Sequence, residues 1–157
     1  MDQFLKSYLE KNEIGHVEHK HEAVYTVEES KKLKQLIPGL HCKCLFLKDN
    51  NKKFYLVALP AQKRLDIKAL RKKLEVKKLN FGSPEELKEK LNLTPGSVSI
   101  FGMVYAKDVA LIIDQQVWDA EISGFHPNIN TSTLELKRKD LEKFYNLLET
   151  EKHVMEL

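Results

Sequence analysis

The sequence predicts a mixed α/β or α+β fold, because helical and strand-like hydrophobic patterns alternate along its 157 residues. Two further features favour this class. Capping signals precede several helical segments, and β-branched and aromatic residues fill the segments between them. A chain of this length can bury a core without disulfides or metals. No internal repeat, low-complexity tract or Pro/Gly/Ser linker divides it, so we expect one domain over residues 1–157.

Helices are expected in five places, and local signals mark three of their starts. Thr26-Val27-Glu28-Glu29 and Ser83-Pro84-Glu85-Glu86 are capping boxes, and Asp66 caps a basic segment. The first and last segments instead show apolar side chains at helical spacing. The expected helices cover residues 2–12, 26–36, 66–74, 83–91 and 139–150, and Trp118 lies in a short helix or turn.

Strand-forming residues are densest in a hairpin, whose arms are residues 43–47 and 54–59 and whose polar turn is residues 48–53. The other expected strands are a short one through Val17, two core strands at 98–105 and 109–113, and two more at 121–125 and 133–136. Together these patterns predict about seven or eight short strands and about four or five helices.

Composition narrows the class of protein. Hydrophobic residues make up 42% and charged residues 31%, as in a soluble globular protein, and the net charge is only +3. The chain has no run of about 18 apolar residues that could span a membrane, and its first residues do not resemble a signal peptide. Two cysteines, Cys42 and Cys44, without a disulfide framework are typical of a reducing compartment. We therefore expect a cytoplasmic protein.

Common catalytic motifs are missing: the sequence has no Gly-x-Ser-x-Gly, phosphate-binding loop, dinucleotide fingerprint or His-Glu-x-x-His. His16, His19 and His21 cluster near the start, and alternate ones on a strand would face together. A metal site there is one interpretation. Structural or solvent-facing histidines are the more ordinary one, because no fourth ligand follows at a diagnostic spacing.

Three other features are candidates for function. Lys43 lies in an apolar strand, so its ammonium must reach water, pair with an anion or line a cavity. His126 precedes Pro127 at a strand end, and polar residues follow that could orient a ligand or simply cap a turn. Lysines and arginines are dense from Lys63 to Lys78, which indicates either a solvated helix face or a surface for phosphates.

Taken in order, several segments resemble the prolyl-tRNA editing family, also called the YbaK or aminoacyl-tRNA-synthetase-associated domain. No single motif is diagnostic, but the ordered set covers most of the chain, from about residue 20 to about residue 145. It is most similar to the free-standing branch that removes alanine from Ala-tRNA(Pro). The matching segments are residues 21–29, 41–49 (His41-Cys42-Lys43-Cys44-Leu45-Phe46-Leu47-Lys48-Asp49), 65–71, 95–99 and Gly124-Phe125-His126-Pro127 with Asn130-Thr131.

The resemblance implies a mixed sheet curled into a barrel-like pocket with helices around it, without metal or cofactor. It implies that the tRNA 3′ end enters this pocket, with tRNA as the partner and prolyl-tRNA synthetase as a further one. Lys43, Gly96 and His126 match the family's catalytic positions. The other residues expected to contact substrate are Val24, Tyr25, Leu45, Ser97, Val98, Ser99, Ile100, Asn130 and Thr131, and those expected to contact tRNA are Lys63, Arg64, Lys68, Arg71 and Lys72.

One departure from the family pattern keeps alternatives open. The family's Gly-x-x-x-Pro loop ends here in Ile100, which lacks the fixed φ of proline. The main prediction is a hydrolase that cleaves the ester of mischarged aminoacyl-tRNA, most favourably Ala-tRNA(Pro). The alternatives are a deacylase for Ser-, Thr- or Cys-charged tRNA, and an inactive module that binds tRNA or a synthetase.

Overall fold

The computed structural model describes residues 1–23 and 27–157. Its helices are α1 (Gln3–Lys11), α2 (Val27–Leu36), α3 (Ile67–Leu74), α4 (Pro84–Leu91), the 3₁₀ helix η1 (Ile100–Tyr105), α5 (Gln115–Asp119) and α6 (Arg138–Leu147). Its strands are β1 (Val17–Lys20), β2 (Leu40–Asp49), β3 (Phe54–Pro60), β4 (Leu79–Phe81), β5 (Val109–Asp114), β6 (Ile122–Phe125), β7 (Ser132–Lys137) and β8 (Lys152–Met155).

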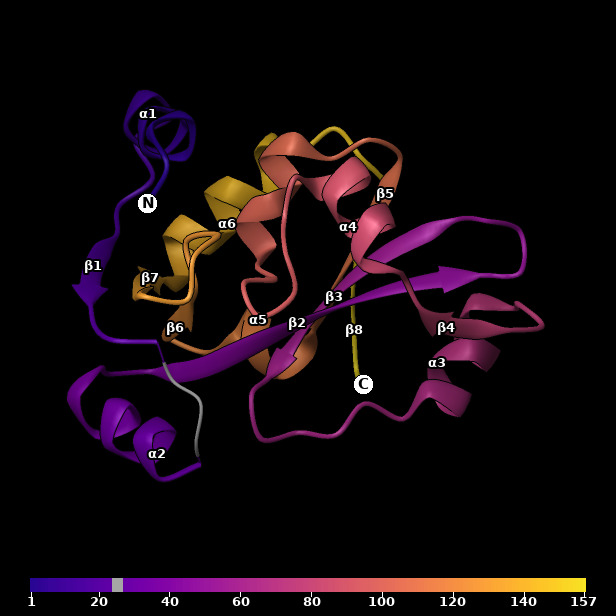
Figure 1. The fold of residues 1–157 in the computed structure, drawn as a ribbon, viewed down its shortest axis with the longest axis horizontal. Coiled ribbons are helices and arrows are strands. Elements are labelled where there is room, and N and C mark those ends of the chain that lie inside the picture. The colour runs from indigo at the N-terminus through magenta and orange to yellow at the C-terminus, as the bar shows by residue number, and fades with distance from the viewer. Residues whose placement is uncertain (24–26) are drawn as a thin grey trace.

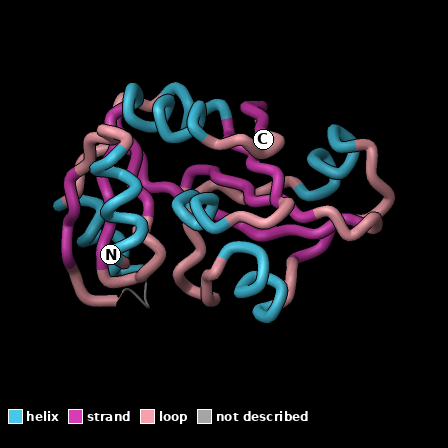
Figure 2. Tube along the Cα trace, turned by 90° about the horizontal axis from the view of Figure 1, so that it is seen from above, coloured by secondary structure: helices cyan, strands magenta, loops and turns pink. Residues whose placement is uncertain are grey.

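The strands form one open mixed sheet of eight strands in the order β1-β7-β6-β2-β3-β5-β8, and β4 pairs with β2 beside this path. The pairs β2–β6, β3–β5 and β5–β8 are parallel, and the others are antiparallel. Seen from above, the strands near the N-terminus run steeply across those at the centre (Figure 2). The expected curled, mixed sheet is therefore confirmed, and its two end strands do not meet to close a barrel.

Helices cover both faces of the central strands, so side chains of β3 are buried on both sides. In Figure 1, α1, α4 and α6 lie above β2 and β3, whereas α2 and α3 lie below. Phe46, Leu56 and Leu111 join the core under the upper helices, and Leu47, Val57 and Leu70 join the core over α3. All seven residues of β3 are buried, as expected for a strand covered on both faces.

The local signals in the sequence act as expected in most elements. The Asp2 carboxylate accepts the Leu5 amide at 2.7 Å, and the Asp66 carboxylate accepts the Ala69 amide at 3.0 Å. Ser83 and Glu86 form a complete capping box at the start of α4. The expected cap at Thr26 lies outside the described residues.

One expected strand was wrong and two strands were missed. Residues 98–105 form no strand; they contain η1, whose start is capped by the Ser99 hydroxyl, which accepts the Phe101 amide at 3.1 Å. Ile100 and Phe101 are fully buried there, and a short buried helix has the same apolar pattern as a core strand. The missed strands are β4 and β8, of 3 and 4 residues, which are too short to show a period.

The fold predicts that Gly82 tolerates no side chain. A Cβ at Gly82 would lie 2.4 Å from two ring carbons of Phe46, which is buried and stacked on Phe54 with ring centroids 5.3 Å apart. We expect Gly82→Ala to lower the free energy of unfolding by about 1–3 kcal/mol through overpacking. Urea denaturation measures this loss. A change below about 0.5 kcal/mol would show that the Phe46 ring yields freely.

Candidate functional site

Lys43 lies in the middle of β2, half-buried, and opposite Leu59 of β3. Because side chains alternate along a strand, Lys43 shares its face with His41 and Leu45. Its ammonium forms no hydrogen bond or ion pair with any described residue. A strand lysine without a protein partner is available to an anionic or polar ligand.

The edge of β2 beside Lys43 is open. On this edge β6 pairs only with Leu40 and His41, and β4 pairs only with residues 47–49. The Gly82 amide then donates to the Phe46 carbonyl at 2.9 Å. Between these contacts, residues 42–45 have β3 as their only strand neighbour in the described part of the chain. The sheet therefore contains a gap along this edge of β2.

A cavity of about 220 Å³ lies at this gap, and we call it the edge cavity. Apolar side chains dominate its wall, to which Gly82, after β4, and Gly96, in the turn before η1, also contribute. Its lining residues are Cys44, Leu45, Phe46, Phe81, Gly82, Ser83, Pro84, Leu87, Pro95, Gly96 and Val98. Leu45, Gly96 and Val98, all expected at the site, therefore meet in one cavity.

The Gly96 loop presents unused main-chain amides beside this cavity. The Ser97 amide donates to the Thr94 carbonyl at 3.1 Å, which closes the turn, whereas the Gly96 and Val98 amides donate to no described residue. Gly96 has φ +88°, a left-handed conformation that favours glycine. Two free amides at a cavity wall can bind a carbonyl oxygen or an oxyanion.

Ile100 ends this loop without the ring of a proline. Its side chain is fully buried, and its amide faces the Cys44 thiol. The cap at Ser99 fixes the next turn. Burial and two hydrogen bonds thus hold the end of the loop, and a proline would lack the amide that contacts Cys44.

The two cysteines at the site are neutral thiols. Burial raises the pKa of Cys42 to about 12 and raises the pKa of Cys44 even further. A thiol is a nucleophile only as the thiolate, so neither side chain is activated for attack at neutral pH. Cys44 instead forms part of the cavity wall.

His126 follows β6 and is held as a neutral imidazole. Its Nδ1 lies 2.9 Å from the Ser132 carbonyl, so Nδ1 carries the proton and Nε2 of the neutral ring is an acceptor. Burial lowers the pKa of His126, and the nearby His21 and His41 lower it further, against the opposing hydrogen bond to Ser132. The His21 and His126 rings lie 6.3 Å apart.

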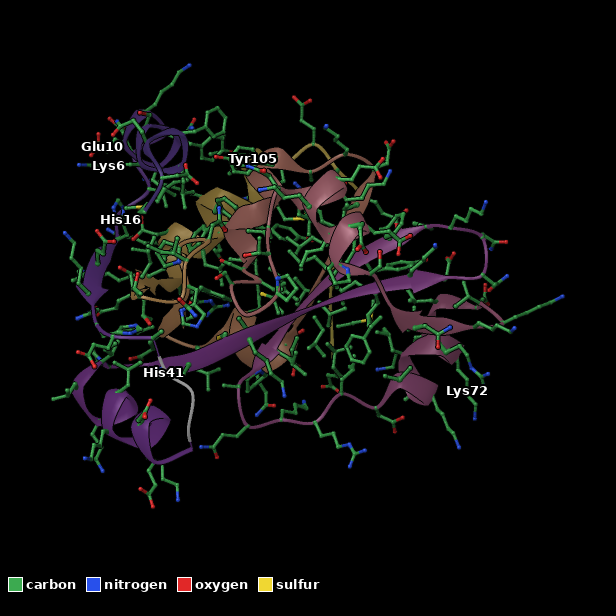
Figure 3. All side chains as sticks on the ribbon, viewed as in Figure 1. Lys6, Glu10, His16, His41, Lys72 and Tyr105 are labelled. Carbon is green, nitrogen blue, oxygen red and sulfur yellow. The ribbon has the colours of Figure 1, made fainter. Side chains whose placement is uncertain are left out.

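His126 lies just beyond the short parallel pairing of β6 with β2. His41 pairs with Gly124, and β6 ends at Phe125, so the pairing of β2 with β6 stops before it reaches Lys43 and His126. His41 lies at the start of β2, close to α2 (Figure 3). The described neighbours of His126 are His21, His41 and the Ser132 carbonyl, and no described contact joins it to Lys43.

The remaining residues expected to contact substrate lie in the Gly96 loop, between β6 and β7, or outside the described residues. Ser99 and Ile100 are buried supports of the loop, and Ser97 lies in its turn. Asn130 and Thr131 lie between β6 and β7, where the Thr131 carbonyl accepts the His21 amide at 2.9 Å. Val24 and Tyr25 lie outside the described residues.

The expected tRNA contacts divide into two sets. Lys63 forms an ion pair within the protein: its ammonium lies 2.9 Å from the carboxylate of Asp114, whose side chain is 1% exposed. Arg64, Lys68 and Lys72 are exposed, and Lys72 extends away from α3 (Figure 3). Arg71 and Lys68 line a second cavity of about 370 Å³, the α3 groove, together with Ile67, Lys77, Lys78, Leu79 and Asn80.

The N-terminal histidines have separate protein partners. His16 bonds the Ile14 carbonyl, His19 pairs with Glu135 at 2.9 Å, and His21 bonds the Thr133 hydroxyl. In the part of the chain that the structure describes, no three His, Cys, Asp or Glu side chains are grouped to hold a metal ion. None of the described helices is long and apolar enough to cross a membrane.

Sequence reasoning missed Phe81 and Gly82, and it named Asn128 only as one of the polar residues after His126. Phe81, the last residue of β4, and Gly82 after it line the edge cavity, and β4 is too short to be detected from the sequence. Asn128 follows His126 with φ 65°, and both polar atoms of its carboxamide are buried without a hydrogen-bond partner.

Known proteins resemble this chain over most of its length. Residues 21–144 match the model of the aminoacyl-tRNA editing domain. The prolyl-tRNA editing protein ProX of Acetoanaerobium sticklandii is 33% identical over 138 residues, which cover 86% of this chain and 84% of that protein. The prolyl-tRNA synthetase associated domain-containing protein 1 of Xenopus laevis is 32% identical over 148 residues, covering 90% and 88%.

A solved structure shows the same fold. It is described as a candidate trans-editing enzyme for prolyl tRNA synthetase, and it superposes with a TM-score of 0.73 at 16% identity over 97% of this chain and 96% of that one. The family match spans the β2 edge, the Gly96 loop and His126 alike. This chain therefore belongs to the aminoacyl-tRNA editing domain family.

Proposed function

We propose that this protein is a trans-editing hydrolase that cleaves the ester bond of mischarged aminoacyl-tRNA, with Ala-tRNA(Pro) as its substrate. The observation that carries the proposal is the edge cavity, which places the free amides of the Gly96 loop beside the open edge of β2. The ProX relative is named as a prolyl-tRNA editing protein, which supports the prolyl system.

The proposed chemistry needs no protein nucleophile, and both thiols are neutral. Water attacks the ester carbonyl, and the amides of Gly96 and Val98 stabilise the oxyanion that forms. The carbon–oxygen bond to the ribose then breaks, the ribose oxygen takes up a proton, and the amino acid leaves. Lys43 binds the polar end of the substrate or the terminal phosphate, and Nε2 of His126 accepts a hydrogen bond that orients the ribose or the water.

The wall of the cavity favours alanine over the alternative amino acids. Among its lining side chains, only Ser83 and Cys44 carry a polar atom, and the Ser83 hydroxyl already caps α4. A serine or threonine side chain would lose hydrogen bonds to water on entering such a wall. A synthetase separates side chains that differ by a methylene by only about 1–3 kcal/mol, so a second pocket of this kind restores accuracy.

The first test measures hydrolysis of Ala-tRNA(Pro) beside Pro-tRNA(Pro) and Ser-, Thr- and Cys-charged tRNA. We expect loss of alanine only. With Lys43→Ala we expect the rate to fall by about tenfold to a hundredfold, the value of one charge-assisted hydrogen bond. Lys53→Ala is the matched control, because Lys53 lies in the same hairpin but pairs with Glu151 at the surface.

Full activity of Lys43→Ala would remove Lys43 from the site. Binding of charged tRNA without any shortening of its lifetime would contradict the hydrolase and leave a binding module in its place.

The depressed pKa of His126 predicts how stability depends on pH. Below pH 6.5 the unfolded chain takes up a proton that folded His126 resists, so the folded state loses stability as pH falls from about 6.5 toward the lower folded pKa. Above pH 6.5 this contribution is fully present. We expect His126→Gln to reduce the loss of unfolding free energy between pH 7.5 and 5.5, measured with urea. Equal losses in both proteins would mean that His126 is not held neutral.

The exposed bases of α3 are proposed to contact tRNA phosphates, which position the ligand without reading sequence. We expect Lys68→Glu and Lys72→Glu to weaken tRNA binding and to reduce the slope of log affinity against log salt by at least about 1 each. Lys63→Met should instead lower stability, because it leaves the buried Asp114 carboxylate unpaired. A salt slope that both charge reversals leave unchanged would exclude this surface.

A further inference from the structure

Phe81 is an exposed aromatic ring at the mouth of the edge cavity. Its side chain is 61% exposed, whereas Leu79, two residues earlier in β4, is 6% exposed. Phe81 pairs with Leu47 of β2, so its ring lies on the face that also carries Leu45 and Lys43. One step further, the Gly82 amide donates to the Phe46 carbonyl, which fixes the end of the strand. A rigid strand thus holds a ring whose surface faces solvent.

The surroundings of Phe81 show what such a ring could bind. The α3 groove also borders β4, and Lys68, Arg71, Lys77 and Lys78 line it. Residues 79 and 80 line this groove and residue 81 lines the edge cavity, so β4 joins a cationic groove to the cavity through an aromatic ring. A positive groove with an aromatic platform is the arrangement that binds single-stranded nucleic acid.

We propose that Phe81 is the stacking platform for the terminal adenine of the tRNA 3′ end. The adenine lies against the Phe81 ring, the preceding phosphates face Lys77 and Lys78, and the aminoacyl ester enters the edge cavity. Leu47, the partner of Phe81, is four residues from Lys43, or about 13 Å along β2. An adenosine and the length of the lysine side chain span this distance. The inference rests on the proposed function, since it names the part of the substrate that the same site holds.

The test uses a fluorescent RNA hairpin that ends in an uncharged CCA, and the same hairpin whose last nucleotide lacks its base. Anisotropy gives the Kd for wild-type protein, Phe81→Ala, Phe81→Leu and Phe81→Tyr. Phe4→Ala is the matched control, because Phe4 is also exposed, at 55%, but packs on Tyr105 of η1. Thermal unfolding of each variant checks that an exposed ring was removed without loss of the fold.

We expect Phe81→Ala and Phe81→Leu to weaken binding of the CCA hairpin by about fivefold to a hundredfold, and Phe81→Tyr to keep the wild-type Kd. Removing the base should weaken binding to wild-type protein by the same factor and have no effect on Phe81→Ala. Independent, additive losses, or equal binding of both hairpins by wild-type protein, would overturn the proposal.

These readouts separate the platform from the hydrolase. Base-dependent binding through Phe81 without hydrolysis of any charged tRNA would leave the platform and remove the deacylase. Hydrolysis of Ala-tRNA(Pro) with unchanged Kd and KM in Phe81→Ala would leave the deacylase and remove the platform. If Phe81→Ala fails to fold, Phe81→Leu and the hairpin without its last base give the same decision.

Discussion

The open edge of β2 follows from a mismatch in length between this strand and its neighbours. β2 has ten residues, β6 covers only its first two on this edge, and β4 covers only its last three. β6 ends at Phe125, two residues before Pro127, and β4 ends at Phe81, so neither short strand extends into the gap. An unpaired strand edge normally invites association with another chain. Here the Gly96 loop and the start of α4 cover it and leave the edge cavity.

The opposite edge of β2 is paired with β3, and this pairing holds β2 in place beside the gap. β3 is buried along its whole length and pairs with β2 on one side and β5 on the other. The stacked rings of Phe46 and Phe54 and the capping box of α4 fix the cavity wall. Preorganised walls matter because amides aimed at a developing charge act only if they need not move during the reaction.

Much of the fold could be predicted from the sequence, because its signals were local. The helices at residues 66–74 and 83–91 have caps that act in the structure as they do in isolated helices. The prediction of a strand at residues 98–105 was wrong. An apolar run such as Ile100-Phe101-Gly102-Met103 has no period that distinguishes a buried helix from a strand. β4 and β8 owe their conformation to pairing with distant strands.

The candidate site was predictable only in part. Lys43, Gly96 and His126 were named from a resemblance, whereas their surroundings depend on long-range contacts such as the parallel pairing of β2 with β6, which joins residues about 80 positions apart. Lys63 was expected to contact tRNA because it lies in a lysine-rich segment, but only the structure shows that it pairs with the buried Asp114. Phe81 carries no signal in sequence, since its exposure results from where β4 stops.

The measurement that tests the central claim most directly is a crystal structure with 3′-deoxy-3′-(alanylamino)adenosine, in which a stable amide replaces the ester. We expect the amide carbonyl to lie within hydrogen-bonding distance of the Gly96 or Val98 amide, in the gap of β2, with Lys43 and His126 beside the ribose. A ligand bound at this gap would establish the open strand edge as the active centre. A ligand bound elsewhere, with the edge cavity empty, would contradict the assignment of the site.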